Sequence, residues 1–163
     1  MGSGKSAVGR AAASKLGVGF IDTDAEIERK QNSSINDIFA VSGEESFRQM
    51  ETAELYGLLL SDTDAVISLG GGTPVRKANQ RVIKELGYTI YLKGSAEMLV
   101  KRLERGTENR PMLKGYDLHE RVEELLRLRE EEYLKIADAV VEISDEDVNT
   151  MSDRVLKVYR RLL

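Results

Sequence analysis

The first six residues constrain the fold of this chain more than any other stretch. Gly2-Ser3-Gly4-Lys5-Ser6 has the spacing of the second half of a phosphate-binding loop. In such a loop the glycines let successive N–H groups point at one anion, and a helix begins directly after it. The first half of the motif, a buried strand and one more glycine, would lie upstream of Met1. The fragment predicts nucleotide binding, and the alternative is a flexible N-terminus before an alanine-rich helix.

Strands and helices alternate along the rest of the chain, which predicts a parallel sheet built from βαβ units. Ligands bind at the carboxyl ends of the strands in such sheets, and two of the predicted strand ends are unusual: Asp22-Thr23-Asp24 and Gly70-Gly71-Gly72. Strands are expected at 19–23, 65–69, 89–92 and 140–143, and helices at 4–16, from 24 to a break at 33–34, and at 35–41, 44–60, 75–86, 95–104, 118–138 and 151–163.

The composition narrows the class of protein. The chain has 163 residues, 41% of them apolar, which suits one globular domain with a sizeable core. It has no cysteine, which excludes disulfides and Cys-ligated metals, and no apolar run long enough for a transmembrane helix. The net charge of −4 argues against broad nucleic-acid binding. We therefore expect a cytoplasmic protein that binds neither nucleic acid nor membranes.

The two unusual strand ends carry residues suited to phosphate chemistry. If the first strand ends between Asp22 and Asp24, one carboxylate can approach a Mg²⁺ ion beside the loop while the other points into the cleft. The alternative is a turn in which Asp24 only caps the next helix. Three consecutive glycines are costly in backbone entropy, so Gly70 to Gly72 favour close approach of a ligand over a plain turn.

Three arginines are candidates for binding an anion. Arg48 lies three residues before Glu51 on one helix, where the alternative is an exposed ion pair. Arg110 lies in an irregular segment that is interpreted either as a mobile lid or as a solvated loop. Arg129 interrupts the apolar stripe of the long helix near the C-terminus, so it must pair with a carboxylate of the protein or of a ligand.

Taken in order, these segments resemble shikimate kinase. The matching stretches are MGSGKS, FIDTDAEIE, FRQMET, SLGGGTP, NRPML and RLREEEY, which together cover nearly the whole chain. The resemblance implies a P-loop, nucleoside-monophosphate-kinase-like α/β fold of three layers, with a parallel sheet of family strand order 2-3-1-4-5. It implies one domain over 1–163, with a lid at about 107–117 and acceptor-binding helices at about 24–61. The implied reaction transfers the γ-phosphoryl group of ATP to the 3-hydroxyl of shikimate, on the route to aromatic amino acids.

On the nucleotide side, the resemblance assigns the ATP phosphates to the loop and the lid. Ser6 would bind Mg²⁺ and Asp22 would support the ion through water, so Mg²⁺ is the expected cofactor and ATP the co-substrate. Lys5 and Arg110 would act on the transferred phosphoryl group, Arg110 by closing with the lid. The residues that would hold the nucleotide are Gly2, Ser3, Gly4, Lys5, Ser6, Ala7 and Arg110.

On the acceptor side, the resemblance assigns three roles. Asp24 would bind the shikimate hydroxyls and act as the base or orienting group. Arg48 and Arg129 would hold the shikimate carboxylate, and the backbone of Gly71 and Gly72 would contact the ring. We expect a monomer whose partners are the small molecules ATP and shikimate.

Two features depart from the family pattern. The family holds adenine through an arginine before the lid, and the spacing here does not choose between Arg102 and Arg105. The loop Ser144-Asp145-Glu146-Asp147 before the last helix is acidic and contains neither Arg nor Pro. The contacts to the base are therefore left open.

The family's first strand, which would precede Gly2 in the centre of the sheet, is missing from the sequence. Five buried Val, Ile or Leu side chains in it would contribute about 10 kcal/mol, comparable with a total domain stability of about 5–15 kcal/mol. We therefore expect a chain from Met1 to fold poorly, and Met1 to correspond to an internal methionine of the family's loop.

Two other functions remain open. Another small-molecule P-loop kinase, such as a gluconate kinase, would share the loop but is not expected to combine the glycine run with both Arg48 and Arg129. A shikimate-kinase-like domain that binds ligand without turnover is the second alternative. The presence of Lys5, Asp24 and Arg110 argues against such a loss of activity.

Overall fold

The structure is a computed structural model that describes residues 2–61, 63–105 and 117–163. Helices and strands alternate, as the sequence predicts. The elements in chain order are α1 (Lys5–Leu16), β1 (Gly19–Asp22), α2 (Thr23–Gln31), α3 (Ile35–Leu59), β2 (Ala65–Ser68), the 3-10 turn η1 (Thr73–Val75), α4 (Lys77–Leu86), β3 (Ile90–Lys93), α5 (Ala96–Arg105), α6 (Leu118–Ile136), β4 (Ala139–Glu142) and α7 (Val148–Tyr159).

The strands form two parallel pairs. β1 pairs with β2, with Ile21 opposite Ile67, and β3 pairs with β4, with Leu92 opposite Val141. Among the described residues, these are the only pairings of the four strands. Parallel pairing with helical crossovers confirms the α/β class expected from the alternating pattern.

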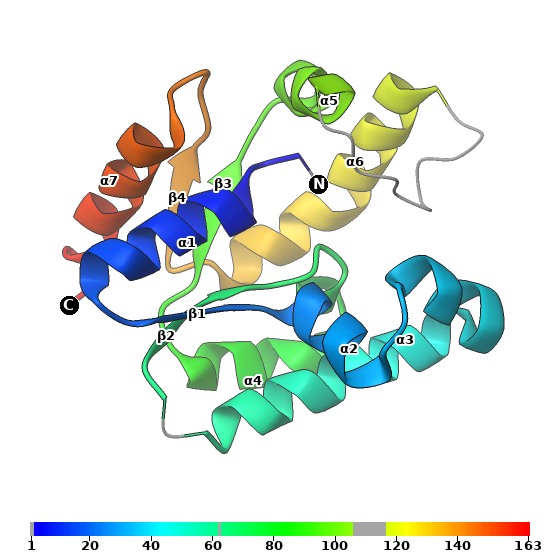
Figure 1. Cartoon of the computed structure of the whole chain (residues 1–163). Helices are drawn as coiled ribbons and strands as arrows, with labels where there is room; N and C mark the ends of the chain where they lie inside the picture. The colour runs from blue at the N-terminus through cyan, green and yellow to red at the C-terminus, as the bar shows by residue number, and fades with distance from the viewer. Residues whose placement is uncertain (1, 62, 106–116) are drawn as a thin grey trace.

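Helices cover both faces of the strand pairs. Figure 1 shows α1 on one side of the β1–β2 pair and α4 on the other, with α7 beside α1. The largest apolar cluster joins α1, α5, α6, α7 and β4 through Val8, Leu99, Val122, Val141 and Met151. A second cluster joins α3, α4 and α6, and a third packs α2 against α3. These clusters hold the helices that carry the candidate site.

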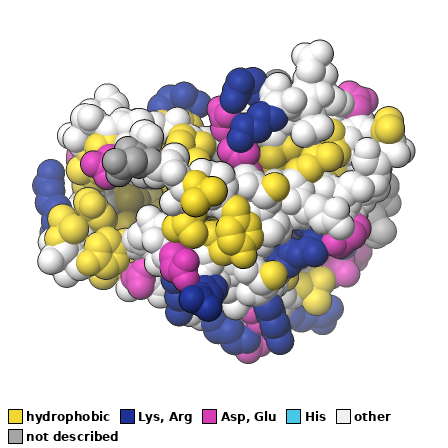
Figure 2. Space-filling view, turned by 90° about the horizontal axis from the view of Figure 1, so that it is seen from below, with side chains coloured by type: hydrophobic (Ala, Val, Ile, Leu, Met, Phe, Trp, Pro, Cys, Tyr) yellow, Lys and Arg dark blue, Asp and Glu magenta, His cyan; other side chains and the backbone are white. Residues whose placement is uncertain are grey.

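The surface carries charges of both signs. On the face shown in Figure 2, seen from below, Lys and Arg side chains alternate with Asp and Glu and with scattered apolar groups. Within the described ranges, no helix has both the length and the apolar content that a bilayer span requires.

Aspartate caps move the starts of α2 and α7 ahead of their predicted positions, and α4 begins at Lys77 rather than at the predicted Val75, which ends η1. The Asp22 carboxylate accepts hydrogen bonds from the N–H groups of Asp24 and Ala25, so α2 begins at Thr23 and Asp24 is not its cap. Asp147 likewise accepts from the N–H groups of Asn149 and Thr150, and α7 therefore begins three residues before the predicted start. An aspartate cap satisfies N–H groups that the helix itself leaves unpaired.

The predicted break between two helices after Val41 is present as a kink. Gly43 has φ 79° and ψ 169°, which are not helical angles, and it divides α3 into two parts. A glycine reaches this positive φ without steric cost. The kink separates the first part of α3 from the part that carries Arg48, as the prediction of two helices at 35–41 and 44–60 requires.

A cavity of about 800 Å³ lies along the strands and α1. Apolar side chains from α1 and from both strand pairs line much of it, among them Val8, Val66, Ile67, Ile90 and Leu92. The four strand residues among these are only half-buried, although parallel strands usually bury both faces. The cavity has the apolar lining that an additional strand between β2 and β3 would need.

We expect an apolar, β-branched segment of roughly seven residues, fused before Gly2, to raise the thermal midpoint of unfolding. It would pair with the edges of β2 and β3 and bury the half-exposed strand side chains. Thermal unfolding followed by circular dichroism measures the effect. A Gly/Ser extension of equal length is the control, and equal midpoints for the two extended chains would contradict the prediction.

Candidate active site

The N-terminal loop presents backbone N–H groups at the start of α1. Gly2 has φ 66° and Gly4 has φ 78°, and Gly4 precedes the first helical residue, Lys5. These left-handed angles curl the chain so that consecutive N–H groups can face one anion. The partial positive charge of the helix N-terminus adds to the charge of Lys5. This geometry favours a phosphate-binding loop over the alternative interpretation, a flexible N-terminus.

Ser6 and Asp22 meet directly beside this loop. The Ser6 hydroxyl donates to Asp22 Oδ2 over 2.5 Å and lies 3.4 Å from the hydroxyl of Ser68 at the end of β2. Burial raises the pKa of Asp22, but the hydrogen bond from Ser6 and the charge of Lys5 outweigh it. The net pKa lies below the ordinary value, so Asp22 is an ionised, hard oxygen donor of the kind that Mg²⁺ prefers.

Asp24 differs from Asp22 although it lies only two residues away. Its Oδ1 is buried and has no hydrogen-bond partner among the described residues. Burial raises the pKa of Asp24, Lys5 lowers it, and the nearby charges of Glu51 and Asp22 raise it again. The net pKa lies above the ordinary value, as is typical of a carboxylate poised to accept a proton.

Arg48 and Glu51 form a buried pair rather than the exposed pair that was the alternative. Arg48 Nη1 donates to Glu51 Oε2 over 2.7 Å, and the two side chains are 14% and 1% exposed. The other oxygen, Glu51 Oε1, accepts from the hydroxyl of Thr73 over 2.5 Å. The outer edge of the Arg48 guanidinium binds the exposed Glu44. A carboxylate bound on both oxygens holds the arginine in one orientation.

Two of the three glycines after β2, Gly70 and Gly72, lie so close to neighbouring side chains that an added Cβ would force those side chains to move. A Cβ added to Gly70 would lie within 3.0 Å of Asp24 Oδ1, Glu51 Oε1 and Thr73 Oγ1. A Cβ added to Gly72 would lie equally close to the Arg48 guanidinium. Side chains of the protein itself therefore approach Gly70 and Gly72, which neither of the two predicted interpretations of this run included.

The backbone of this loop is fixed by specific bonds. The Gly70 N–H donates to the Thr23 hydroxyl over 3.1 Å, and the Gly71 carbonyl accepts from the Tyr133 hydroxyl over 2.5 Å. The structure gives the N–H groups of Gly71 and Gly72 no partner among the residues it describes. These two N–H groups are available to an anionic or hydroxyl-rich ligand.

Arg129 approaches the same loop from α6. Its Nη1 lies 3.5 Å from the position of a Cβ added to Gly71. Arg48 therefore reaches the loop from α3 and Arg129 reaches it from α6. Two cations therefore meet the backbone of one loop, and a pair of guanidinium groups is suited to binding a carboxylate.

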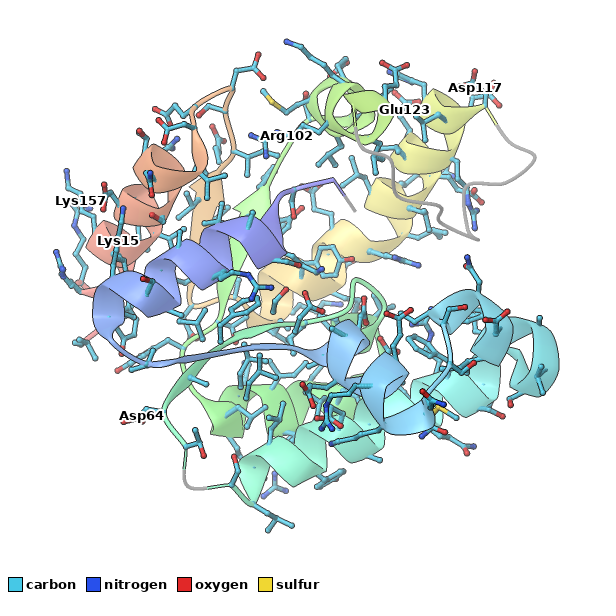
Figure 3. The ribbon with its side chains drawn as sticks, in the orientation of Figure 1. Lys15, Asp64, Arg102, Asp117, Glu123 and Lys157 are labelled. Carbon is cyan, nitrogen blue, oxygen red and sulfur yellow. The ribbon has the colours of Figure 1, made fainter. Side chains whose placement is uncertain are left out.

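A second, smaller cavity of about 230 Å³ lies behind the phosphate loop, between Gly4, Arg102 and the loop before α7. Arg102 donates to the Ser3 carbonyl over 3.0 Å and to the Ser144 carbonyl, so it joins the two loops (Figure 3). Arg102 is the one of the two arginines left open by the sequence whose side chain the structure describes. The Arg105 side chain and the whole of Arg110 lie outside the described residues, so the proposed lid is not placed.

Three residues of this arrangement were not predicted as site residues: Ser68, Thr73 and Tyr133. Tyr133 is the last residue of the RLREEEY segment, and its position four residues after Arg129 was the available signal. Ser68 and Thr73 flank the glycine run on either side. Small hydroxyl residues are too common at strand ends for that position alone to predict a role.

We expect Gly70→Ala to lower the free energy of unfolding by about 1–3 kcal/mol, because the added methyl group would force apart the side chains packed on Gly70. Gly57→Ala is the matched control, since Gly57 lies in α3 with open space around it. There, loss of backbone freedom in the unfolded chain should raise the free energy by about 0.5–1 kcal/mol. Urea unfolding of both variants measures the two effects, and changes of the same sign would contradict the account of Gly70.

Comparison with known proteins identifies the family. The sequence profile described as shikimate kinase matches residues 1–160. A shikimate kinase of Rhizobium meliloti is 40% identical over 156 residues, which cover 96% of this chain and 80% of the relative. One of Thioalkalivibrio sulfidiphilus is 35% identical over 160 residues, covering 98% of this chain and 83% of the relative.

Solved structures agree with the sequence comparison. The shikimate kinase of Acinetobacter baumannii in complex with shikimate superposes with a TM-score of 0.93 at 32% identity, covering 99% of this chain and 89% of that one. The shikimate kinase of Bacteroides thetaiotaomicron superposes with a TM-score of 0.90 at 29% identity, with coverages of 98% and 94%. The chain therefore has the P-loop, nucleoside-monophosphate-kinase-like fold and belongs to the shikimate kinase family of ATP-dependent kinases.

Proposed function

We propose that this chain transfers the γ-phosphoryl group of ATP to the 3-hydroxyl of shikimate, and that the residues described above carry out the transfer. The observation that carries the proposal is the convergence of Arg48 and Arg129 on the Gly71–Gly72 backbone, next to the Asp24 carboxylate, whose buried Oδ1 has no hydrogen-bond partner among the described residues. A planar acid with hydroxyl groups matches two arginines on one side and a carboxylate on the other.

The nucleotide would bind across the N-terminal loop. The polyphosphate would bind to the loop N–H groups and to Lys5 at the start of α1. The base would lie in the cavity that Gly4 and Arg102 line. In this proposal Gly2 to Ala7 bind the phosphates and Arg110 closes over them with the lid. Arg102, rather than Arg105, contacts the base.

Ser6 and Asp22 fit a Mg²⁺ ion. A hydroxyl and an ionised carboxylate provide the hard oxygen donors that Mg²⁺ prefers, and the ion usually keeps several waters and binds substrate phosphates. Within the described part of the chain, no three His, Cys, Asp or Glu side chains gather as a metal site. We therefore propose that Ser6 binds the ion directly and Asp22 through water. The bound ion would neutralise charge on the phosphates.

Shikimate would bind between α2, α3 and α6. Arg48 and Arg129 would hold its carboxylate, and the N–H groups of Gly71 and Gly72 would add hydrogen bonds. The Asp24 carboxylate would then face the hydroxyl groups at the other end of the molecule. A raised pKa lets Asp24 take the hydroxyl proton as the oxygen attacks the γ-phosphoryl group. Lys5, which acts on both aspartates, would stabilise the negative charge on the transferred group.

An assay with three acceptor conditions tests the proposal against its alternatives. ADP release is measured with shikimate, with gluconate and with no acceptor. We expect release only with shikimate. Release with gluconate would favour another small-molecule kinase, and shikimate binding without ADP release would favour a catalytically silent domain.

A cytoplasmic location and a monomeric state also remain predictions, which cell fractionation and analytical ultracentrifugation test.

We expect Asp24→Asn to lower kcat by about 10²–10⁴-fold, because the amide cannot accept the hydroxyl proton. The affinity for ATP should remain nearly constant, since Asp24 is not proposed to contact the nucleotide. Steady-state kinetics with shikimate and a separate measurement of ATP binding distinguish the two effects. Near-normal turnover in this variant would remove Asp24 from the mechanism.

We expect Arg129→Ala to weaken shikimate binding by about 30- to several-thousand-fold, which corresponds to the loss of one partner from a desolvated charge pair. Arg129→Lys should recover only part of the affinity, because lysine lacks the planar fork of arginine. Arg127→Ala, on the exposed side of the same helix, is the control and should have little effect. Calorimetric titration with shikimate measures all three, and unchanged affinity in Arg129→Ala would contradict the proposed site.

A further inference from the structure

Tyr133 lies where the two halves of the proposed carboxylate site meet. It is one helical turn after Arg129 on α6, and its hydroxyl donates to the Gly71 carbonyl over 2.5 Å. The Tyr133 hydroxyl lies 3.6 Å and Arg129 Nη1 lies 3.5 Å from the same point, the position of a Cβ added to Gly71. One tyrosine hydroxyl therefore touches the glycine loop beside the guanidinium.

The hydroxyl also interacts with Arg129 itself. Burial raises the pKa of Tyr133, whereas the charge of Arg129 and a hydrogen bond with it act to lower that pKa. A tyrosine hydroxyl has one donor and two acceptor positions, so it can accept from Arg129 while it donates to Gly71. The three groups form a chain that runs from Arg129 through Tyr133 to Gly71.

The hydrogen bond from Tyr133 to the Gly71 carbonyl also restricts the N–H of Gly72, which belongs to the same peptide unit. The peptide unit is planar and trans, so the carbonyl of Gly71 and the N–H of Gly72 point in opposite directions. A glycine pair has wide freedom to rotate this unit when nothing holds it. By holding the Gly71 carbonyl, the hydroxyl of Tyr133 also fixes the direction of the Gly72 N–H.

We propose that Tyr133 is a positioning residue for the acceptor carboxylate, because its hydroxyl fixes Arg129 and the Gly71–Gly72 peptide relative to each other. This inference rests on the proposed function of the site. In this arrangement Tyr133 does not touch the acceptor. It sets the orientation of two groups that do.

The aromatic ring and the hydroxyl of Tyr133 have separable roles. The ring packs against Tyr91 of β3, with centroids 5.2 Å apart and planes inclined at 52°. Phenylalanine would keep this ring contact and lose only the hydroxyl. Tyr133→Phe therefore tests the positioning role with little change in core packing.

Tyr133→Phe should raise the dissociation constant and the KM for shikimate by about 5- to 30-fold, since the Gly71 carbonyl and Arg129 each lose a partner. The KM for ATP and the thermal midpoint should change little. Calorimetric titration with shikimate, steady-state kinetics and thermal unfolding provide these readouts. An equal rise in both KM values together with a lower midpoint would show a structural role and overturn the inference.

Two further variants sharpen the test. Tyr91→Phe removes a hydroxyl from the other ring of the same aromatic pair, and it should leave the shikimate affinity unchanged. In a double-mutant cycle, Tyr133→Phe should cost much less in an Arg129→Ala background than in the unmodified chain, because the two residues act together. Additive effects would overturn the inference.

The same measurements separate this inference from the proposed function. If Arg129→Ala weakens shikimate binding and Tyr133→Phe does not, the site stands and the positioning role is wrong. If neither variant affects shikimate binding, the proposed carboxylate site itself is wrong. A selective loss of shikimate affinity in both, with Tyr91→Phe unchanged, supports the inference.

Discussion

Three side chains from separate elements converge on the bare backbone at the end of β2, and the rest of the site depends on this contact. Asp24 from α2, Glu51 from α3 and Thr73 from η1 all occupy the space that a side chain at Gly70 would fill. The bond from Thr73 to Glu51 and the pair of Glu51 with Arg48 follow from it. Without this close approach, α2 and α3 could not bring a carboxylate and an arginine to the same strand end.

Burial, hydrogen bonds and neighbouring charges shift the pKa values of the two aspartates in opposite directions. Asp22 is stabilised as an anion by Ser6 and Lys5, whereas Asp24 is buried beside Glu51 and holds its proton more tightly. Such a separation of pKa values between neighbouring carboxylates is typical of sites in which one binds a cation and the other moves a proton. The pKa values of these two nearby aspartates differ because they lie in different surroundings. Asp22 at the end of β1 bonds to Ser6 of α1, whereas Asp24 lies in the first turn of α2.

The fold class and the four strands could be predicted from the sequence, because local periodicity and turn residues determine them. The starts of α2 and α7 were misplaced because more than one aspartate could serve as a cap, and only the final backbone path selects Asp22 and Asp147. The resemblance located Asp24, Arg48 and Arg129, but it could not show whether the Arg48–Glu51 pair is buried or exposed.

By itself, the sequence determined which residues carry charge, where glycines free the backbone, and which family the ordered motifs resemble. Only the tertiary structure decided which of these groups meet. Tyr133 and Thr73 have no distinctive local signal, and their bonds to Gly71 and Glu51 span 62 and 22 residues of chain. Arg102 likewise contacts a loop that lies 42 residues further along the chain. Such contacts depend on how helices pack across the sheet, which local residue preferences do not specify.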